Sequence, residues 1–377
     1  MKILFTGGGS GGHFYPIIAI AEELRRIARE ERLILPELFF MAPGPYDARL
    51  LFDQEIAFLP VTTGKLRRYF SLQSAVDILR TVWGILQALA VVFRIFPDVV
   101  VGKGGFGSFP ALFAARTFKI PVLIHESDSI PGKVNAWAGK FARRVAVSFP
   151  SAAQFFPREP KKIAYTGNPI RAELLSGQRG EGLAAFGLGE SIPVILVLGG
   201  SLGSVTLNNA LLTILPKLLE TCQVVHQTGM NNVEDVKART SVLLQRHPFA
   251  TRYRPAGYLS AEELAHIAAA ATLIISRAGS TIFEIAAWGI PAILVPIADS
   301  NGDHQRQNAY EYAKMGSALV IEEYNLKPTI LLAEIEKIVG NDALREQMAT
   351  QAKRWAKIDA ATVIAREIID MALRHEK

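Results

Sequence analysis

The chain has 377 residues, of which 50% are hydrophobic and 20% charged, a globular composition that excludes disorder of the whole chain. At about 100–200 residues per domain, this length predicts two or three domains. A single cysteine, Cys222, excludes a disulfide framework and a thiolate metal cage, and favours a reducing, cytosolic compartment.

The net charge is +6, and its distribution along the chain is uneven. Residues 1–165 hold 21 Lys and Arg against 13 Asp and Glu, whereas the remainder is slightly acidic. Such asymmetry indicates an anionic partner for the first half, such as nucleic acid or a phospholipid surface. Ordinary scatter in surface charge is the alternative.

We expect no targeting segment, because MKILFTGGG is too short for the apolar core of a signal peptide, about 7–15 residues. The most apolar stretch is 72–96, and its uncharged core, 81–93, spans 13 residues. Since crossing a bilayer takes about 20 residues, we expect this stretch to lie on a membrane or in a core rather than to span.

The first half begins with an apolar run at 2–6, a glycine turn at 7–12 and a helical pattern at 16–29, with Pro16 in the first turn. A second strand is predicted at 38–42, ended by Pro43-Gly44-Pro45. Further Val- and Ile-rich strands alternate with helical stretches: strands 98–101, 121–125 and 144–147, and helices 72–96, 108–118 and 133–143. Such alternation predicts a mostly parallel sheet covered on both faces.

The second half repeats this opening, with a strand at 194–198, a glycine turn at 199–204 and a helix at 207–219. Later strands are predicted at 224–227, 273–276 and 292–295, and an amphipathic helical stretch at 343–374. The sequence therefore predicts an α/β protein with two Rossmann-like domains facing across a cleft. We place the domains at 1–166 and 167–355, and a C-terminal helix, free to pack back on the first domain, at 356–377.

The glycine turns indicate anion binding more strongly than dinucleotide binding. Gly7, Gly9 and Gly12 match G-x-G-x-x-G, but the second strand ends MAPGP, with no carboxylate before Asp47 to hold a ribose. A nicotinamide or flavin enzyme is therefore disfavoured, and no Walker P-loop is present. A glycine turn before a helix still lets an anionic ligand approach the helix N-terminus.

Two such domains favour a group transferase that binds one substrate on each, or a two-lobed ligand-binding protein, which would need an export signal. The sequence has no D-x-D, H-x-H or H-E-x-x-H pattern, so we expect no catalytic metal and no cofactor. Helix N-termini, hydroxyls and arginines would then neutralise a leaving diphosphate. No basic–aromatic nucleic-acid module is recognisable, so we expect no nucleic-acid partner.

Seven motifs occur in the order found in the MurG family, the lipid-linked N-acetylglucosaminyltransferases within glycosyltransferase family 28, and the chain resembles that family over nearly its whole length. They are GGGSGGHFYP (7–16), GKGGFGSFP (102–110), HESDSIPGKVN (125–135), GNPIR (167–171), GGSLGS (199–204), SRAGSTIFE (276–284) and DHQRQNA (303–309). The resemblance implies the glycosyltransferase B fold and inverting, metal-independent transfer of N-acetylglucosamine from UDP-GlcNAc to undecaprenyl-diphosphate-linked N-acetylmuramoyl-pentapeptide (lipid I), giving lipid II.

The resemblance also implies a peripheral location at the cytoplasmic face of the plasma membrane. Lys65, Arg67 and Arg68 precede the apolar stretch 72–96, and Lys140, Arg143 and Arg144 cluster later in the same half, as suits an anionic membrane surface. The alternatives for function are a related glycosyltransferase with a different lipid or small-molecule acceptor, and a non-catalytic sugar-nucleotide-binding relative.

Residue by residue, the resemblance implies that the Glu284 carboxylate binds ribose, the Leu259 backbone binds uracil and Gln305 contacts the sugar. Asp128 occupies a position that is asparagine in some members of the family. The other implied substrate-binding residues are Ser10, Gly11, Gly12, Arg171, Ser201, Gly279, Ser280 and Thr281. Ser201 as a simple helix cap and Glu284 as a solvated first-turn glutamate are the structural alternatives.

An inverting transfer needs a base, and His13 is the first candidate because it follows the glycine turn at the start of a helix. The positive end of the helix dipole disfavours imidazolium, which keeps such a histidine neutral and basic. Glu126, beside His125, is the second catalytic candidate, and Asp128 is a further carboxylate in the same turn. A capping role for His13 and a buried structural role for Glu126 are the alternatives.

Overall fold

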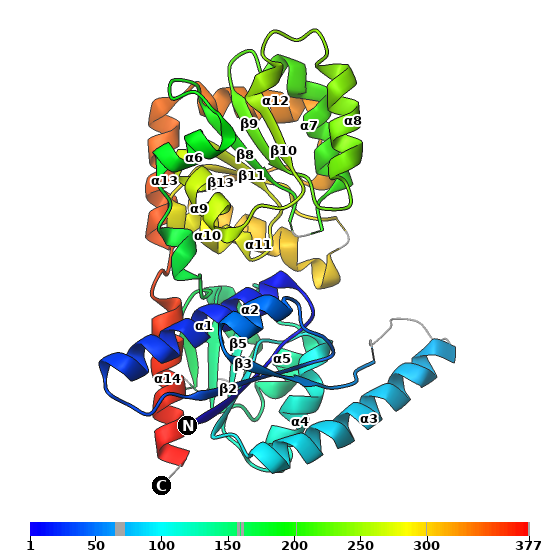
Figure 1. The fold of residues 1–377 in the computed structure, drawn as a ribbon, viewed down its shortest axis with the longest axis vertical. Coiled ribbons are helices and arrows are strands. Elements are labelled where there is room, and N and C mark those ends of the chain that lie inside the picture. The colour runs from blue at the N-terminus through cyan, green and yellow to red at the C-terminus, as the bar shows by residue number, and fades with distance from the viewer. Residues whose placement is uncertain (65–71, 157–158, 160–161, 201, 299, 376–377) are drawn as a thin grey trace. The chain divides into compact units, whose positions relative to one another are not determined.

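The computed structural model describes the chain except residues 65–71, 157–158, 160–161, 201, 299 and 376–377. Lys65, Arg67, Arg68 and Ser201, named above as candidates, therefore lie outside the described residues. The chain forms two compact units, which Figure 1 shows. Unit 1 comprises Met1–Arg171 and Lys357–Lys377, and unit 2 comprises Ala172–Ala356. The chain thus passes between the units twice.

The described part of unit 1 contains a parallel sheet in the order β3-β2-β1-β4-β5-β6-β7. The order reverses between β1 and β4, and ligands of such sheets bind at the carboxyl ends of strands flanking the reversal. The strands are β1 Lys2–Thr6, β2 Glu37–Ala42, β3 Ile56–Pro60, β4 Val99–Gly102, β5 Val122–Glu126, β6 Arg144–Val147 and β7 Ile163–Tyr165.

Helices cover both faces of this sheet, which explains why its strands are apolar runs rather than alternating ones. One buried cluster joins the sheet to α1, α2 and α14, and the other joins it to α3, α4 and α5. These helices are α1 Gly11–Glu30, α2 Ala48–Asp53, α3 Leu72–Ile95, α4 Phe109–Thr117, α5 Lys133–Ala138 and α14 Ala360–His375, with short 3₁₀ helices at Phe106–Ser108 and Pro150–Phe155.

Helix α1 begins earlier than predicted. It starts at Gly11, so Pro16 lies inside the helix rather than in its first turn. Ser10 is the N-cap residue, and its carbonyl accepts hydrogen bonds from the N–H groups of His13 and Phe14. The glycine turn therefore runs straight into the helix, and two glycines with low helix propensity form its first residues.

Helix α3 buries only one side. Ala88 and Val92 are fully buried and pack with α4, whereas Leu79, Trp83 and Phe93 are 69%, 58% and 67% exposed. Among the described residues, the stretch Val76–Ile95 is long and apolar enough to cross a membrane by length and composition, with a mean hydropathy of 1.7. The argument from its uncharged core alone, which made the stretch too short to span, was therefore wrong. That argument counted only the residues between two charged ones, although a stretch long enough to cross a membrane can contain two charged residues.

The described part of unit 2 contains a second parallel sheet, in the order β10-β9-β8-β11-β12-β13, with its reversal between β8 and β11. The strands are β8 Val194–Leu198, β9 Gln223–Gln227, β10 Tyr253–Ala256, β11 Leu273–Ser276, β12 Ala292–Leu294 and β13 Ala318–Val320. The helices are α6 Arg179–Phe186, α7 Val205–Leu218, α8 Val233–Leu243, α9 Ala261–Ala270, α10 Thr281–Trp288, α11 His304–Ala313, α12 Pro328–Val339 and α13 Asp342–Trp355. Short 3₁₀ helices occupy Ala172–Leu175, Ala250–Arg252, Asn301–Asp303 and Glu323–Asn325.

The single helical stretch predicted at 343–374 is two helices. Helix α13 ends at Trp355, and Ala356 turns to extended backbone (φ −61°, ψ 137°) before α14 begins at Ala360. No proline or glycine marks this break, so the hydrophobic periodicity of the sequence predicted one continuous helix. The break is where the chain leaves unit 2 and returns to unit 1.

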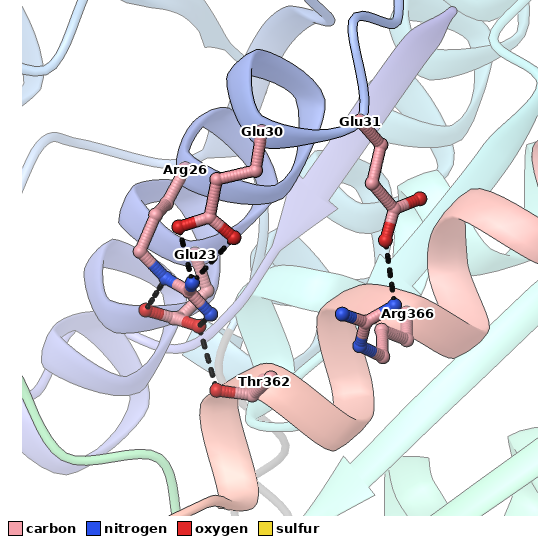
Figure 2. A network of polar contacts seen from close by, with 6 residues as sticks. All are labelled: Glu23, Arg26, Glu30, Glu31, Thr362 and Arg366. Carbon is pink, nitrogen blue, oxygen red and sulfur yellow. Dashed lines mark hydrogen bonds and ion pairs between the residues drawn. The ribbon is translucent and has the colours of Figure 1, made fainter.

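In unit 1, α14 packs along α1. Figure 2 shows Glu23, Arg26 and Glu30 of α1 in one network, with Thr362 of α14 donating to the Glu23 carboxylate at 2.6 Å. A separate ion pair joins Arg366 to Glu31 at 2.7 Å. The ion pairs of Arg26 and Arg366 are largely exposed, so they fix the orientation of the helices more than they stabilise the fold. The apolar side of α14 is buried in the core beneath them.

Candidate functional site

Two glycine turns meet at the carboxyl edge of the sheet in unit 1. The first, 7–10, follows β1, and the second, 103–107, follows β4. A Cβ placed on Gly105, which has φ +80°, would lie 2.7 Å from the Cα of Gly8. Only glycine permits this backbone-to-backbone approach at such a φ. The motifs GGGSGG and GKGGFGS thus form one continuous surface.

His13 stands at this surface as the third residue of α1. Its Nδ1 lies 2.7 Å from the Oγ of Ser10, which orients the ring, and the side chain is half-buried. Gly11 is buried, and a Cβ there would lie 3.0 Å from the Tyr15 ring and 3.1 Å from the Tyr46 hydroxyl, closer than an ordinary contact. Gly12 is the second helical residue. The structure therefore groups Ser10, Gly11, Gly12 and His13 at one helix N-terminus.

Glu126 is the last residue of β5 and is buried, and both of its carboxylate oxygens accept hydrogen bonds. Oε1 accepts from the Asp128 N–H at 3.0 Å, while Oε2 accepts from the Gly132 N–H and the Asn135 side chain at 3.1 and 2.9 Å. Burial raises the pKa of Glu126, and Asp128 raises it further. This geometry suits a residue that shapes the loop carrying Asp128 better than one that reaches a substrate.

Lys103 is a site residue that the sequence did not single out. Its side chain is fully buried, and its ammonium donates to the Ser127 hydroxyl and, at 3.3 Å, to Oδ1 of Asn168. Burial lowers the pKa of Lys103, and the negative charges of Glu126 and Asp128 oppose that shift. A buried lysine is rare, and its place between glycines gave no sign of burial. The only feature of the sequence that could have drawn attention to Lys103 was a basic residue inside the glycine motif GKGG.

His125 is held neutral beside this cluster. Its Nε2 lies 3.0 Å from the Gly167 carbonyl and 3.2 Å from the Ser148 hydroxyl, and burial followed by the charge of Lys103 lowers its pKa well below the usual value. Through Lys103 and His125, the ends of β4 and β5 are tied to the segment 167–168.

Arg171, the last residue of this segment in unit 1, is almost buried and stacks on the ring of Tyr15, with its guanidinium carbon 4.2 Å from the ring centre. Its Nε is buried without a hydrogen-bond partner among the described residues. A cation stacked on an aromatic face keeps its in-plane N–H groups available to a ligand. Arg171 therefore packs against α1 through Tyr15, the fifth residue of that helix.

In unit 2, the turn 199–204 leads into α7, and Ser204 is the cap. Its Oγ accepts from the Leu207 N–H at 3.2 Å, so the capping role considered for Ser201 belongs to Ser204. Gly200 and Gly203 have φ of +86° and +76°, and a Cβ on Gly203 would lie 2.0 Å from the Thr228 carbonyl oxygen. These positions require glycine, and they bring the turn against the end of β9.

Arg277 joins the strand ends of unit 2 and was also missed by the sequence reasoning. This buried side chain donates to the Ser204 hydroxyl, to the Val295 carbonyl at 3.0 Å and to the Glu323 carboxylate at 2.5 Å. Burial acts to raise the pKa of Glu323, but the Ala298 N–H and Arg277 outweigh it and lower that pKa. Arg277 thus fixes the α7 N-terminus relative to β11 and β12.

The turn after β11 carries Gly279, Ser280 and Thr281. Ser280 is the N-cap residue of α10, Thr281 its first residue, and Glu284 lies in its first turn, half-buried. A Cβ on Gly279 would meet nothing within 4 Å, so the turn is open on that side. Leu259 is buried just before the capping box of α9, formed by Ser260 and Glu263.

Gln305 lies at the start of α11, where its Oε1 accepts from the Ile297 N–H at 3.2 Å. A cavity of about 260 Å³ adjoins it. The lining residues are Pro296, Ile297, Ala298, Asp303, Arg306, Glu322, Glu323 and Tyr324. The candidate residues of unit 2 that the structure describes therefore follow three strand ends, those of β10, β11 and β12. Across the described part of the chain, no group of three or more His, Cys, Asp or Glu is placed to hold a metal ion.

Each of the two Rossmann-like units has glycine turns and helix N-termini at the carboxyl edge of its sheet. Together with the similarities reported next, this arrangement identifies a glycosyltransferase of the B-type fold. Residues 3–147 match the glycosyltransferase family 28 N-terminal domain and residues 194–365 match its C-terminal domain. The chain therefore belongs to glycosyltransferase family 28.

Individual relatives agree with this assignment. The chain is 36% identical, over 99% of both sequences, to the UDP-N-acetylglucosamine–N-acetylmuramyl-(pentapeptide) pyrophosphoryl-undecaprenol N-acetylglucosamine transferase of Halothermothrix orenii. It also resembles the crystal structure of Acinetobacter baumannii MurG, with a TM-score of 0.73 and 27% identity over 98% of this chain and 99% of that one. A putative UDP-N-acetylglucosamine 2-epimerase of Listeria monocytogenes, at TM-score 0.71 and 15% identity over 99% and 97% of the two chains, shares the fold alone. The resemblance to the MurG family, the two-domain fold and the hexosyltransferase class are thus confirmed.

Proposed function

We propose that this chain transfers N-acetylglucosamine from UDP-GlcNAc to undecaprenyl-diphosphate-linked N-acetylmuramoyl-pentapeptide, forming lipid II. The observation that carries the proposal is the end-to-end similarity to transferases whose names state this donor and this acceptor. No nucleic acid, cofactor or catalytic metal enters the proposed reaction.

Unit 2 binds the donor in this proposal. Glu284 accepts hydrogen bonds from the ribose hydroxyls, the backbone at Leu259 contacts uracil, and Gln305 contacts the sugar. The diphosphate lies against the α10 N-terminus at Gly279, Ser280 and Thr281 and against the turn that contains Ser201. Two helix N-termini at adjoining strand ends support this assignment, because their free N–H groups favour an anion. The buried Arg277 positions both turns.

Unit 1 binds the acceptor, and His13 is the base. With the proton of neutral His13 on Nδ1, donated to Ser10, Nε2 carries the lone pair that accepts the proton of the acceptor hydroxyl. That oxygen forms a bond to the anomeric carbon from the face opposite UDP, and UDP leaves with the electron pair of the broken bond. The configuration inverts. Arg171 and the donors at the glycine turn hold negative charge on the leaving diphosphate.

Glu126 serves this reaction by positioning. Its saturated, buried carboxylate holds the loop of Asp128 in place, and the half-buried Asp128 faces the acceptor in this proposal. The geometry favours His13 over Glu126 as the base, because a base must reach the proton that it removes.

We further propose that the protein is peripheral on the cytoplasmic face of the plasma membrane. Helix α3 has an exposed apolar side, and Lys140 and Arg143 are exposed in the same unit. Arg144 contributes less, because it pairs with Glu367 at 2.6 Å. Apolar anchors with flanking cations suit an anionic leaflet.

The test of the transferase is incubation with labelled UDP-GlcNAc and a short-chain lipid I analogue. Label moving into the lipid product supports the proposal. Transfer to a different lipid, such as a diacylglycerol, or UDP-GlcNAc binding without any transfer would contradict it and identify one of the two alternative functions. Chelator should leave the rate unchanged.

A further inference from the structure

A cavity of about 340 Å³ in unit 1 has no role in the site described above. It is lined by Pro43, Pro60, Val61, Thr62, Thr63, Arg80 and Gln87. Pro43 follows β2, the residues from Pro60 to Thr63 end β3 and continue beyond it, and Arg80 and Gln87 belong to α3. The cavity therefore opens at the carboxyl edge of the sheet, where open α/β sheets bind ligands.

The walls of this cavity are fixed by direct contact between α3 and the segment that follows β3. A Cβ on Gly84 would lie 1.7 Å from the Thr62 carbonyl oxygen, and one on Gly64 would lie 1.9 Å from that of Asp77. The Thr62 N–H also donates to Oε1 of Gln87 at 2.9 Å. Because helix and loop touch through glycines, the cavity is preformed.

Its polar lining is rich in donors. The Arg80 guanidinium is exposed and has a long ion pair of 3.9 Å with Asp77, which orients it without using its full donor capacity. The Thr63 hydroxyl is buried and has no hydrogen-bond partner among the described residues. Since Oε1 of Gln87 accepts from Thr62, its amide N–H₂ is the group left for a ligand. Arginine, hydroxyl and amide donors, with no carboxylate in the lining, suit a phosphate.

The cavity lies between two other surfaces of unit 1. On one side, Pro43 packs against the second glycine turn, where a Cβ on Gly107 would lie 2.8 Å from its Cδ. On the other side, Arg80 neighbours the exposed Leu79 and Trp83 of α3. Along the surface of unit 1, the glycine turn is therefore followed by the phosphate-sized cavity and then by the apolar face of α3. A polyprenyl-diphosphate sugar presents the same sequence of groups: sugar, diphosphate, hydrocarbon.

We propose that this cavity binds the diphosphate of the polyprenyl-linked acceptor, with Arg80, Thr63 and Gln87 as donors. The acceptor sugar then lies at the glycine turns, and the hydrocarbon leaves along α3. The identity of the lipid rests on the proposed function, but the diphosphate site itself does not.

A short prenyl diphosphate tests the site without any turnover. Titration of the full chain with farnesyl diphosphate, followed by calorimetry, should show binding, and farnesol should bind much more weakly. Arg80→Gln should weaken farnesyl diphosphate binding by about tenfold or more, the loss expected for a charge-assisted hydrogen bond. Arg94→Gln is the matched control, since Arg94 is exposed at the other end of the same helix and lines no part of the cavity. Equal losses in both variants would overturn the site, because only net charge would then matter.

Thr63→Val provides a second variant of similar volume that lacks only the unpartnered hydroxyl. It should also weaken binding, with an unchanged thermal midpoint of unfolding. Wild-type affinity in both Arg80→Gln and Thr63→Val would overturn the proposal. Vesicles of phosphatidylglycerol separate the two lipid sources: if Arg80→Gln lost vesicle binding but kept farnesyl diphosphate affinity, the cavity would serve bulk lipid and the proposal would fall.

Kinetics in detergent, without vesicles, connects the site to the reaction. Arg80→Gln should raise the KM for the short-chain acceptor while leaving UDP affinity unchanged; an unchanged KM would overturn the acceptor assignment. Farnesyl diphosphate binding that depends on Arg80, in a chain that transfers no N-acetylglucosamine, would refute the proposed function and leave the diphosphate site standing.

Discussion

His13 is a half-buried side chain whose Nδ1 lies 2.7 Å from the Ser10 hydroxyl. If His13 removes the acceptor proton, His13→Ala should lower kcat by about 10²–10⁴-fold, the usual contribution of a general base, and leave UDP affinity nearly unchanged. Ser10→Ala, which removes this contact, should cause a smaller loss. Normal kcat in His13→Ala, together with inactive Asp128→Asn, would move the role to the carboxylate.

His226 provides a pH-dependent prediction in unit 2. Its ring nitrogens contact the Tyr253 hydroxyl at 2.9 Å and Oδ1 of Asn208 at 3.0 Å, and burial lowers its pKa from 6.5 to about 3. A folded-state pKa below the unfolded one means that the unfolded chain binds the proton first as pH falls. Stability from this group is complete above about pH 6.5 and is lost toward pH 3, at up to about 1.4 kcal/mol per pH unit.

His226→Gln, which does not titrate, should therefore flatten the acid dependence of urea unfolding in this range. The buried His125 of unit 1 acts in the same direction and remains in the variant as an internal reference. An identical pH slope in wild type and variant would show that His226 is not neutral in the folded state.

Sequence reasoning at the residue scale depended on recognisable motifs. It placed Ser10, His13, Glu126 and Glu284 at strand ends and helix starts, because glycine turns and apolar runs fix where a strand stops. It missed Lys103 and Arg277, whose importance lies in burial and in partners far along the chain. The identity of a charged residue in the sequence does not by itself indicate whether its side chain is buried or exposed.

Helix α3 is the element with the largest unpartnered apolar side among those discussed. The double variant Leu79→Ser, Trp83→Ser should weaken sedimentation with phosphatidylglycerol vesicles by about tenfold or more, because each side chain transfers apolar surface worth about 1.5–3 kcal/mol when fully buried. Val242→Ser on α8, also an exposed apolar side chain but in unit 2, is the control. Vesicle binding that ignored salt and anionic-lipid content would refute the electrostatic part of the proposal.

Element boundaries differed from the predicted ones where a local signal was ambiguous. Proline is common in the first turn of helices, and Pro16 is predicted there for that reason. Helix α1 nevertheless begins at Gly11, since the last glycines of the turn already have helical geometry. The α13–α14 break lacks any breaker residue, and only the need to return to unit 1 accounts for it. In both cases tertiary context overrode local propensity.

At the scale of the molecule, α14 completes the core of unit 1. Ile364, Ile368 and Met371 are buried with residues of β1 and α1. Ile368→Ala should destabilise unit 1 by about 2–5 kcal/mol, through lost burial and a residual cavity. Val363→Ala, on the exposed side of α14, should change stability little. Urea unfolding with a probe in each unit measures both, and a loss confined to unit 2 would contradict the packing.

The two passages of the chain between the units have a consequence for biosynthesis. Unit 2 is one continuous segment, whereas unit 1 needs its first 171 residues and its last helix. At about 5–20 residues per second, a ribosome takes about 10–40 s to make everything after Arg171. For that interval the nascent first sheet has its α14 side uncovered, and unit 2 is complete at Ala356, before α14 is made. Unit 1, whose synthesis begins before that of unit 2, is therefore completed after it, when α14 covers the open side of the first sheet.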